Sequence, residues 1–272
     1  MLETETNVLS GTVADGSLWT SDLHALRVRT GSLNPYSGNY TFLIEGCTDW
    51  GSCFGDGLGL SPDGDGPATV KISDSGILTL SGKLADGTSI VQSAAVLEQG
   101  FWPLYVPLYG GGGFLTGWVD AGQPSSTVYW LTPPSVPRNY YTHGFGPQMR
   151  LGLLTKYVVP PQGQNAVSWN KASVQITGGN LPVAVYSADP PSSEVSLSNN
   201  VVRVVSGTIS NLNIKITASN GLFNGTFVNP VSGKLTPFSG ALLPSEDAPI
   251  DAGGFWLGPL GESGNIRLKG HQ

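Results

Sequence analysis

Residues 212–221 decide the fold class, and their sequence is LNIKITASNG. Leu212, Ile214 and Ile216 alternate with polar residues, which is the period of a strand with one buried face. Asn220-Gly221 then supplies the signal for a tight turn between antiparallel strands. Similar alternation and similar turns recur along the chain, whereas no long stretch keeps helical spacing without an interrupting Gly or Pro. The sequence therefore predicts an all-β protein.

Two segments repeat one order of strands and turns. The first begins with a strand at residues 70–72 and reaches Gly100-Phe101-Trp102. The second begins with a strand at residues 214–216 and reaches Gly254-Phe255-Trp256. Because short turns join antiparallel neighbours, we expect each copy to be a β-meander. The prediction is two related antiparallel β-meander halves from an internal duplication, each a small barrel or sandwich. The alternative is one larger barrel or sandwich that both halves share.

A polar segment with two prolines, PPQGQN at residues 160–165, marks the expected boundary between the halves. We assign residues 1–159 to the first half, with an N-terminal strand and a loop rich in proline and aromatic residues at positions 133–143. Residues 160–272 form the second half.

Composition narrows the possible partners. The 272 residues carry a net charge of −6, only 12% of them are charged, and Lys and Arg form no cluster. Nucleic acid and anionic membranes both require a basic surface, so the sequence excludes them as partners. The apolar runs are too short for a membrane-spanning helix, so we expect no membrane insertion.

The only cysteines are Cys47 and Cys53, and their spacing suits a disulfide that closes a small loop. Two free buried thiols are the alternative, and a zinc site would need two further ligands nearby. The N-terminal residues have neither the basic nor the apolar region of a signal peptide. A cytoplasmic protein and a mature secreted segment both fit that observation, and the expected disulfide favours secretion or the cell surface.

Six short motifs stand out along residues 36–270: Gly38-Asn39-Tyr40-Thr41, Asp86-Gly87-Thr88, Trp102-Pro103-Leu104-Tyr105, Gly221-Leu222-Phe223-Asn224-Gly225, Phe238-Ser239-Gly240 and Phe255-Trp256-Leu257-Gly258. Together they resemble a duplicated β domain of large secreted bacterial surface proteins of verrucomicrobial type. In those proteins the domain often follows immunoglobulin-like repeats. The resemblance implies secretion and surface display, and it supplies no activity and no catalytic residues.

The most informative segment for binding is FWPLYVPLY at residues 101–109. In an extended strand, Phe101, Tyr105 and Tyr109 share the face opposite the predicted core residues. Pro103 and Pro107 remove N–H donors from one side of that strand, which predicts an edge strand or an unpaired ladder. Exposed aromatic rings with polar tips suit the faces of sugar rings. The alternative is that this strip packs under the 133–143 loop or against the other half.

Other aromatic residues divide between the surface and the core. Trp50 lies in the loop between the cysteines and is a second candidate for stacking, and Tyr140 and Tyr141 are added from the proline-rich loop. Four tryptophans lie within strand-like runs and are expected in the core: Trp118, Trp130, Trp169 and Trp256.

Metal and catalytic motifs are weak. Asp63 and Asp65 resemble half of a calcium loop, and Asp56 could add a ligand, but Ile72 occupies the position where a helix-loop-helix site needs Glu. A plain surface turn is the favoured reading. The chain lacks the serine-hydrolase elbow and the zinc-protease helix motif. A glycosidase would need a nearby pair of carboxylates, and six residues could supply one: Glu45, Asp49, Asp56, Glu98, Glu246 and Asp251.

These observations lead to one expectation and two alternatives for function. We expect a secreted or cell-surface, non-catalytic module that binds polysaccharide or cell-surface glycan. The first alternative is a structural subunit that self-associates into a surface fibre, in which the N-terminal strand at residues 7–13 adds to an edge strand of a neighbour. The second is a glycosidase with a carboxylate pair on its loops.

Overall fold

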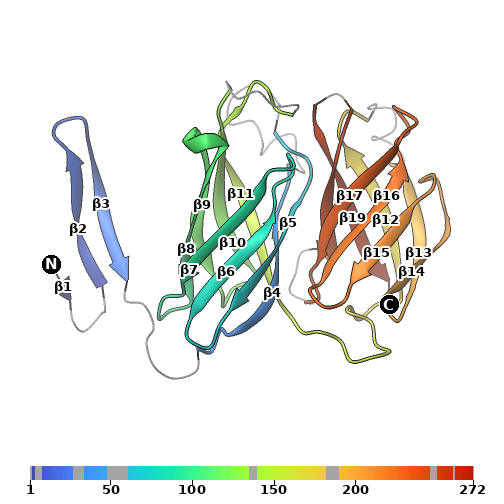
Figure 1. Cartoon of the computed structure of the whole chain (residues 1–272), viewed down its shortest axis with the longest axis horizontal. Helices are drawn as coiled ribbons and strands as arrows, with labels where there is room; N and C mark the ends of the chain where they lie inside the picture. The colour runs from blue at the N-terminus through green and yellow to red at the C-terminus, as the bar shows by residue number, and fades with distance from the viewer. Residues whose placement is uncertain are drawn as a thin grey trace.

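The computed structural model of the chain describes residues 2–3, 8–26, 34–47, 61–134, 140–181, 190–245, 250–259 and 261–271. Apart from the short 3-10 turn η1 (Tyr109–Gly111), every regular element in this part of the chain is a strand, and every strand pair is antiparallel. The strands form two eight-stranded barrel-like sheets and one three-stranded N-terminal sheet (Figure 1). The predicted all-β fold with two antiparallel halves is therefore confirmed. Among the described residues, no helix has the length and apolar character needed to cross a membrane.

The first barrel is nearly closed. Its strands follow the order β7-β6-β5-β4-β11-β10-β9-β8, so that β7 and β8 are the two edges. These edges lie side by side without a backbone ladder, joined by a hydrogen bond of 2.8 Å from Gln92 Nε2 to Pro103 O. The strands are β4 (Gly38–Ile44), β5 (Gly66–Ile72), β6 (Ile77–Lys83), β7 (Ser89–Ala95), β8 (Phe101–Leu108), β9 (Gly113–Asp120), β10 (Ser125–Thr132) and β11 (Phe145–Tyr157).

The second barrel is closed, in the order β12-β13-β14-β15-β16-β17-β18-β19. Strand β11 ends the first barrel at Tyr157 and β12 begins the second at Lys171, so residues 160–165 lie between the two. The strands are β12 (Lys171–Gly178), β13 (Ser192–Ser198), β14 (Val201–Gly207), β15 (Asn213–Thr217), β16 (Leu222–Val228), β17 (Leu235–Leu242), β18 (Ala252–Leu257) and β19 (Ser263–His271).

The two barrels use their repeated strands in the same order but complete them differently. Strands β5 to β9 of the first barrel correspond to β15 to β19 of the second. The first barrel adds β4 from before this series and β10 and β11 from after it. The second barrel takes β12, β13 and β14 entirely from before the series. This arrangement is consistent with two related halves that close at different points of the chain.

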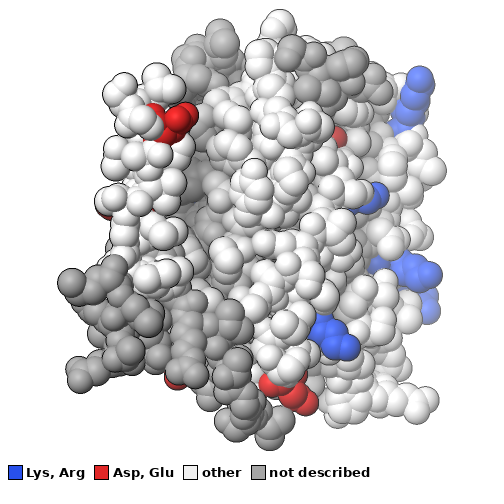
Figure 2. All heavy atoms as spheres, turned by 60° about the vertical axis from the view of Figure 1, so that its left-hand side comes forward, with Lys and Arg blue, Asp and Glu red and all other residues white. Residues whose placement is uncertain are grey.

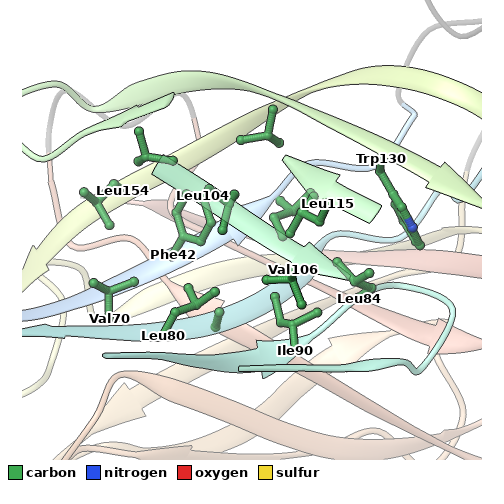
Figure 3. Close-up of a cluster of buried hydrophobic side chains, with 14 of the residues drawn as sticks. Phe42, Val70, Leu80, Leu84, Ile90, Leu104, Val106, Leu115, Trp130 and Leu154 are labelled. Atoms are coloured by element: carbon green, nitrogen blue, oxygen red, sulfur yellow. The ribbon is translucent and has the colours of Figure 1, made fainter. Parts of the chain in front are cut away.

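The core of the first barrel lies inside the curved sheet, where side chains from opposite strands meet (Figure 3). Alternate residues of β8 point inward as expected, and Trp102 is fully buried and packs edge-on against Phe42 at 6.3 Å between ring centroids. The second barrel buries Trp256 in the same way. The predictions of Trp130, Trp169 and Trp256 as core residues are confirmed, since they are 2%, 5% and 0% exposed.

The barrels pack against each other through the outer faces of β4, β5 and β11 on one side and of β16, β17 and β18 on the other. Leu43 and Leu153 meet Ala241 and Leu243 in a buried apolar cluster. Polar contacts surround that cluster, including a main-chain hydrogen bond of 3.1 Å from Asp65 N to Gly254 O. This packing explains why β4 is buried on both faces although its sequence alternates.

The N-terminal sheet consists of β1 (Leu2–Glu3), β2 (Val8–Asp15) and β3 (Trp19–Leu26) in that order. Strands β2 and β3 pair along their whole length as a hairpin, and none of the three pairs with a strand of either barrel. The expected N-terminal strand is thus part of a separate sheet rather than of the first barrel.

Candidate functional site

The outer face of strands β8 to β11 presents rings in register across the sheet. Tyr105 of β8 is paired with Thr116 of β9, which is paired in turn with Tyr129 of β10. Tyr129 is paired with Met149 of β11. Paired residues of neighbouring strands point to the same side of a sheet, so these four side chains form one row.

A second row lies two residues along the same strands. Trp118 is opposite Pro103 of β8, and on β10 Thr127 is paired with Leu151 of β11. The large side chains of both rows are exposed to solvent: Tyr105 58%, Trp118 49%, Tyr129 42%, Met149 63% and Leu151 43%. We call these five residues the aromatic outer face. An exposed cluster of this kind on a folded domain marks an interaction site.

The aromatic outer face carries almost no charge. Strands β8 and β10 contain no Asp, Glu, Lys or Arg, and the only acid of β9 is Asp120 at its end. Arg150 of β11 is buried, because it is paired with the core residue Val128. Figure 2 turns the left-hand side of Figure 1 toward the viewer, and on the face that it shows charged residues are sparse, with Lys and Arg on one side of the view. The face therefore suits a neutral ligand.

The prolines of β8 explain why this face reaches an open edge. Strand β8 pairs only with β9, which confirms the predicted edge strand. The Pro103 carbonyl points toward β7, where it accepts the bond from Gln92. Since Pro103 and Pro107 have no N–H, they remove two donors from the side of β8 that faces β7. The barrel therefore cannot close its backbone ladder here.

Within the predicted strip, Tyr105 alone is fully on the aromatic outer face, and Phe101 is half-buried at the start of β8. Tyr109 leaves the face because its φ of 53° turns the chain into η1. Its hydroxyl donates to Asp86 Oδ2 at 2.7 Å and accepts from Trp130 Nε1 at 3.1 Å. Burial, followed by the charge of Asp86, raises the pKa of Tyr109 above its ordinary value. Tyr109 thus closes one end of the barrel.

The other predicted stacking residues do not join this face. Tyr141 is 4% exposed, and its hydroxyl accepts from Ser263 N at 2.7 Å. It therefore ties the first barrel to the second and has no free ring face for a ligand. Tyr140 is half-buried against the core of the first barrel. Trp50 lies outside the described residues.

Sequence reasoning missed most of the aromatic outer face. Trp118 was expected in the core, and this prediction is wrong because Leu115 and Val119 of β9 fill the barrel interior from the other parity. The alternation of side chains in a strand could have identified this residue, because Trp118 shares a face with Phe114 and Thr116 and lies opposite the face of Leu115 and Val119. Tyr129 could have been found in the same way, because it lies between Val128 and Trp130, which are both buried on the opposite face.

The predicted calcium residues lie at the contact between the barrels instead of on a surface turn. Asp65 is fully buried and pairs with Arg267, its Oδ2 lying 3.1 Å from Arg267 Nε. Asp63 lies two residues before it in the sequence, and Asp56 lies outside the described residues. Within the described part of the chain, no group of three or more His, Cys, Asp or Glu side chains is placed to hold a metal ion.

The remaining predicted residues are distributed as follows. Cys53 lies outside the described residues, so its pairing with Cys47 stays a prediction. Among the possible glycosidase carboxylates, Glu45 bonds to Arg267 and Asp251 accepts from Gly270 N. Asp49, Asp56 and Glu246 lie outside the described residues.

Asp63 is the titratable group whose environment is most unusual. Burial, followed by the charge of Glu262, raises its pKa to about 7, against the opposing effects of Arg150 and of the Gly179 N–H. The Asp63 carbonyl accepts from Asn265 Nδ2 at 3.1 Å, which holds this segment on the second barrel. Asp63 therefore favours the neutral carboxyl form at the contact between the barrels.

This raised pKa predicts a loss of stability as the pH rises. The folded pKa exceeds the unfolded value, so the stabilising contribution of the neutral carboxyl is present below about pH 4 and is lost as the pH rises to about 7. We expect Asp63→Asn to reduce this loss by a few kcal/mol in urea unfolding curves at about pH 5 and about pH 8. Asp74 is exposed, and Asp74→Asn serves as a control that should lose as much stability between the two pH values as the wild type does. An equal loss of stability in the wild type and in Asp63→Asn would contradict the effect assigned to Asp63.

Comparison with known proteins does not extend these observations, because no protein-family model and no curated protein matches the chain. The fold itself defines the class: an all-β protein of two packed antiparallel barrels with an exposed aromatic outer face on the first.

Proposed function

We propose that this chain is a secreted or cell-surface, non-catalytic module that binds a neutral glycan on the aromatic outer face. The observation that carries the proposal is the register of Tyr105, Trp118 and Tyr129 on three neighbouring strands whose only charged residue is Asp120 at the end of β9. The similarity to the duplicated β domain of secreted bacterial proteins supports the location.

The spacing of the rings suits a linear polysaccharide. Tyr105 and Tyr129 are separated by one strand, so their backbones lie roughly 10 Å apart at about 4.8 Å per strand. Two rings at this separation can stack on alternate sugars of an extended chain. Thr116 lies between the two rings and Thr127 lies in the second row beside Leu151, and their hydroxyls can donate to and accept from sugar hydroxyls. The hydroxyls of the tyrosines add polar tips to apolar surfaces.

Affinity electrophoresis against a panel of neutral polysaccharides tests this function. We expect at least one polysaccharide to retard the wild-type chain and Trp118→Ala to bind at least tenfold more weakly, which corresponds to ~1.4 kcal/mol. Because Trp118 is about half exposed, its replacement should change the free energy of unfolding by less than ~1 kcal/mol.

Ile77→Ala provides a matched control, since Ile77 is 47% exposed on β6 of the same barrel and lies outside the aromatic outer face. Its retardation should equal that of the wild type. If every polysaccharide leaves the wild type unretarded, or if Trp118→Ala and Ile77→Ala behave alike, the proposed function is wrong.

A further inference from the structure

Strand β14 of the second barrel is paired fully on one side only. It has six register pairs with β13 but a single one with β15, Val201 with Lys215. Among the described residues, 202–207 make no register pair on the side of β15. Their backbone groups on that side form a free strand edge within a closed barrel, which is a template for another strand.

The side chains at this edge are apolar and exposed. Val204 is paired with Val195, a core residue that is 1% exposed, yet Val204 itself is 45% exposed. Val201 and Val205 are 55% and 67% exposed. A register shift between Glu194 and Val195 bends the pair β13–β14 at this point. Val204 is thus a core-facing side chain that is open to solvent, whereas Val201, paired with the exposed Ser198, lies on the outer face of β14.

The N-terminal sheet presents a complementary strand. In the register of β2 and β3, Leu9, Val13, Leu23 and Trp19 lie on one face of the hairpin, which therefore has an apolar side. These four side chains are 40–50% exposed. Strand β3 is an edge strand, paired only with β2. Strand β1 adds only two residues, so the sheet is close to a two-stranded hairpin, which is only marginally stable in water, and it gains stability if it adds to another sheet.

The charges of the two segments are opposite. The only charged residues between positions 201 and 217 are Arg203 and Lys215, and both are exposed. The only acidic or basic residues between positions 8 and 26, His24 aside, are Asp15 and Asp22. The acid on the neighbouring strand β13, Glu194, already faces His271 at 3.5 Å. Electrostatic attraction therefore favours an encounter between β14 and the N-terminal sheet.

We propose that the N-terminal sheet of one copy adds to the free edge of β14 in a second copy of this chain. Strand β3 supplies the backbone ladder, and Leu23 with its neighbours covers Val204. Two different surfaces meet in this contact, so it is heterologous and allows dimers or longer chains of copies. The contact does not use the aromatic outer face and does not depend on glycan binding.

Sedimentation velocity of the full chain over a concentration series tests the proposal. We expect the wild type to associate as its concentration rises. Val204→Glu and Leu23→Glu should each weaken association at least tenfold, because each places an acid in the apolar contact. Val91→Glu is the matched control: Val91 is 70% exposed on β7 of the first barrel, and its replacement should leave association unchanged. Circular dichroism of each variant verifies that the barrels remain folded.

Mixing the two defective variants gives the sharpest result. The Val204→Glu chain keeps an intact N-terminal sheet, and the Leu23→Glu chain keeps an intact β14, so an equimolar mixture should recover a heterodimer. Three results would overturn the proposal: a wild type that is monomeric at every concentration, a Val204→Glu chain that associates like the wild type, or a mixture that stays monomeric.

Discussion

Replacing Trp256 by alanine should lower the free energy of unfolding by about 3–5 kcal/mol, as expected for the loss of a fully buried tryptophan. Trp256 is 0% exposed, and its ring meets Phe227 edge-on at 5.3 Å between centroids. Gly179 and Gly264 allow their backbones to approach this ring so closely that a Cβ at either position would clash with it. The backbone around Trp256 therefore has little room to move into the cavity that the alanine would leave. Urea unfolding followed by circular dichroism measures the loss.

The equivalent tryptophan of the first barrel gives an internal comparison. Trp256 Nε1 donates to Asn265 O at 3.2 Å, whereas Trp102 Nε1 is buried without a hydrogen-bond partner among the described residues. We expect Trp256→Phe to be more destabilising than Trp102→Phe, because it alone removes a buried hydrogen bond. A loss below ~1 kcal/mol for Trp256→Ala would contradict the packing described for the second barrel.

Replacing Arg267 by methionine should also lower the free energy of unfolding by about 3–5 kcal/mol. Arg267 bonds to both carboxylate oxygens of Asp65, at 3.1 and 3.2 Å, and to Glu45 Oε1 at 3.2 Å. The Asp65 side chain is 0% exposed, so it would be left as a buried charge without its arginine. Burial and the charge of Asp65 already raise the pKa of Glu45, which makes this pair of acids more dependent on Arg267.

A double variant separates the unpaired charge from the lost contact area. Asp65→Asn combined with Arg267→Met leaves no buried charge at this position, so it should be less destabilising than Arg267→Met alone. Gly46 N donates to Asp65 Oδ1 at 2.8 Å in the wild type, and it can still donate to the amide oxygen of the asparagine in this variant. If Arg267→Met unfolds within ~0.5 kcal/mol of the wild type, the ion pair does not stabilise the contact between the barrels.

Local alternation predicted the strands well where one face meets solvent. Residues Asn213–Thr217 of β15 show the expected buried Ile214 and Ile216 between exposed neighbours. It failed for β4, where Leu43 is as buried as Phe42. The second barrel covers the outer face of β4, and no pattern within β4 reports a contact with residues of β17, which lie far away in the sequence.

Only part of the candidate site was predicted, because it too depends on contacts between strands that are apart in the sequence. The parity of β8 placed Tyr105 outward correctly, and the prolines located the edge. The same alternation was wrong for Tyr109, because β8 ends at Leu108 and the positive φ of Tyr109 turns its side chain away from the outer face. Trp118 was expected in the core because it lies within a strand-like run, although its position in β9 alternates with the buried Leu115 and Val119. Which rings share one face depends on the pairing of β8, β9 and β10, and pairing register is a property of the folded sheet.

The most direct test of the proposed glycan site follows the indole N–H resonances of the chain during titration with an oligosaccharide of a polysaccharide that retards it. We predict that the Trp118 indole N–H resonance shifts on titration, while those of the buried Trp102 and Trp256 stay in place. A Trp118 indole that does not move as the oligosaccharide saturates the chain would contradict binding on the aromatic outer face.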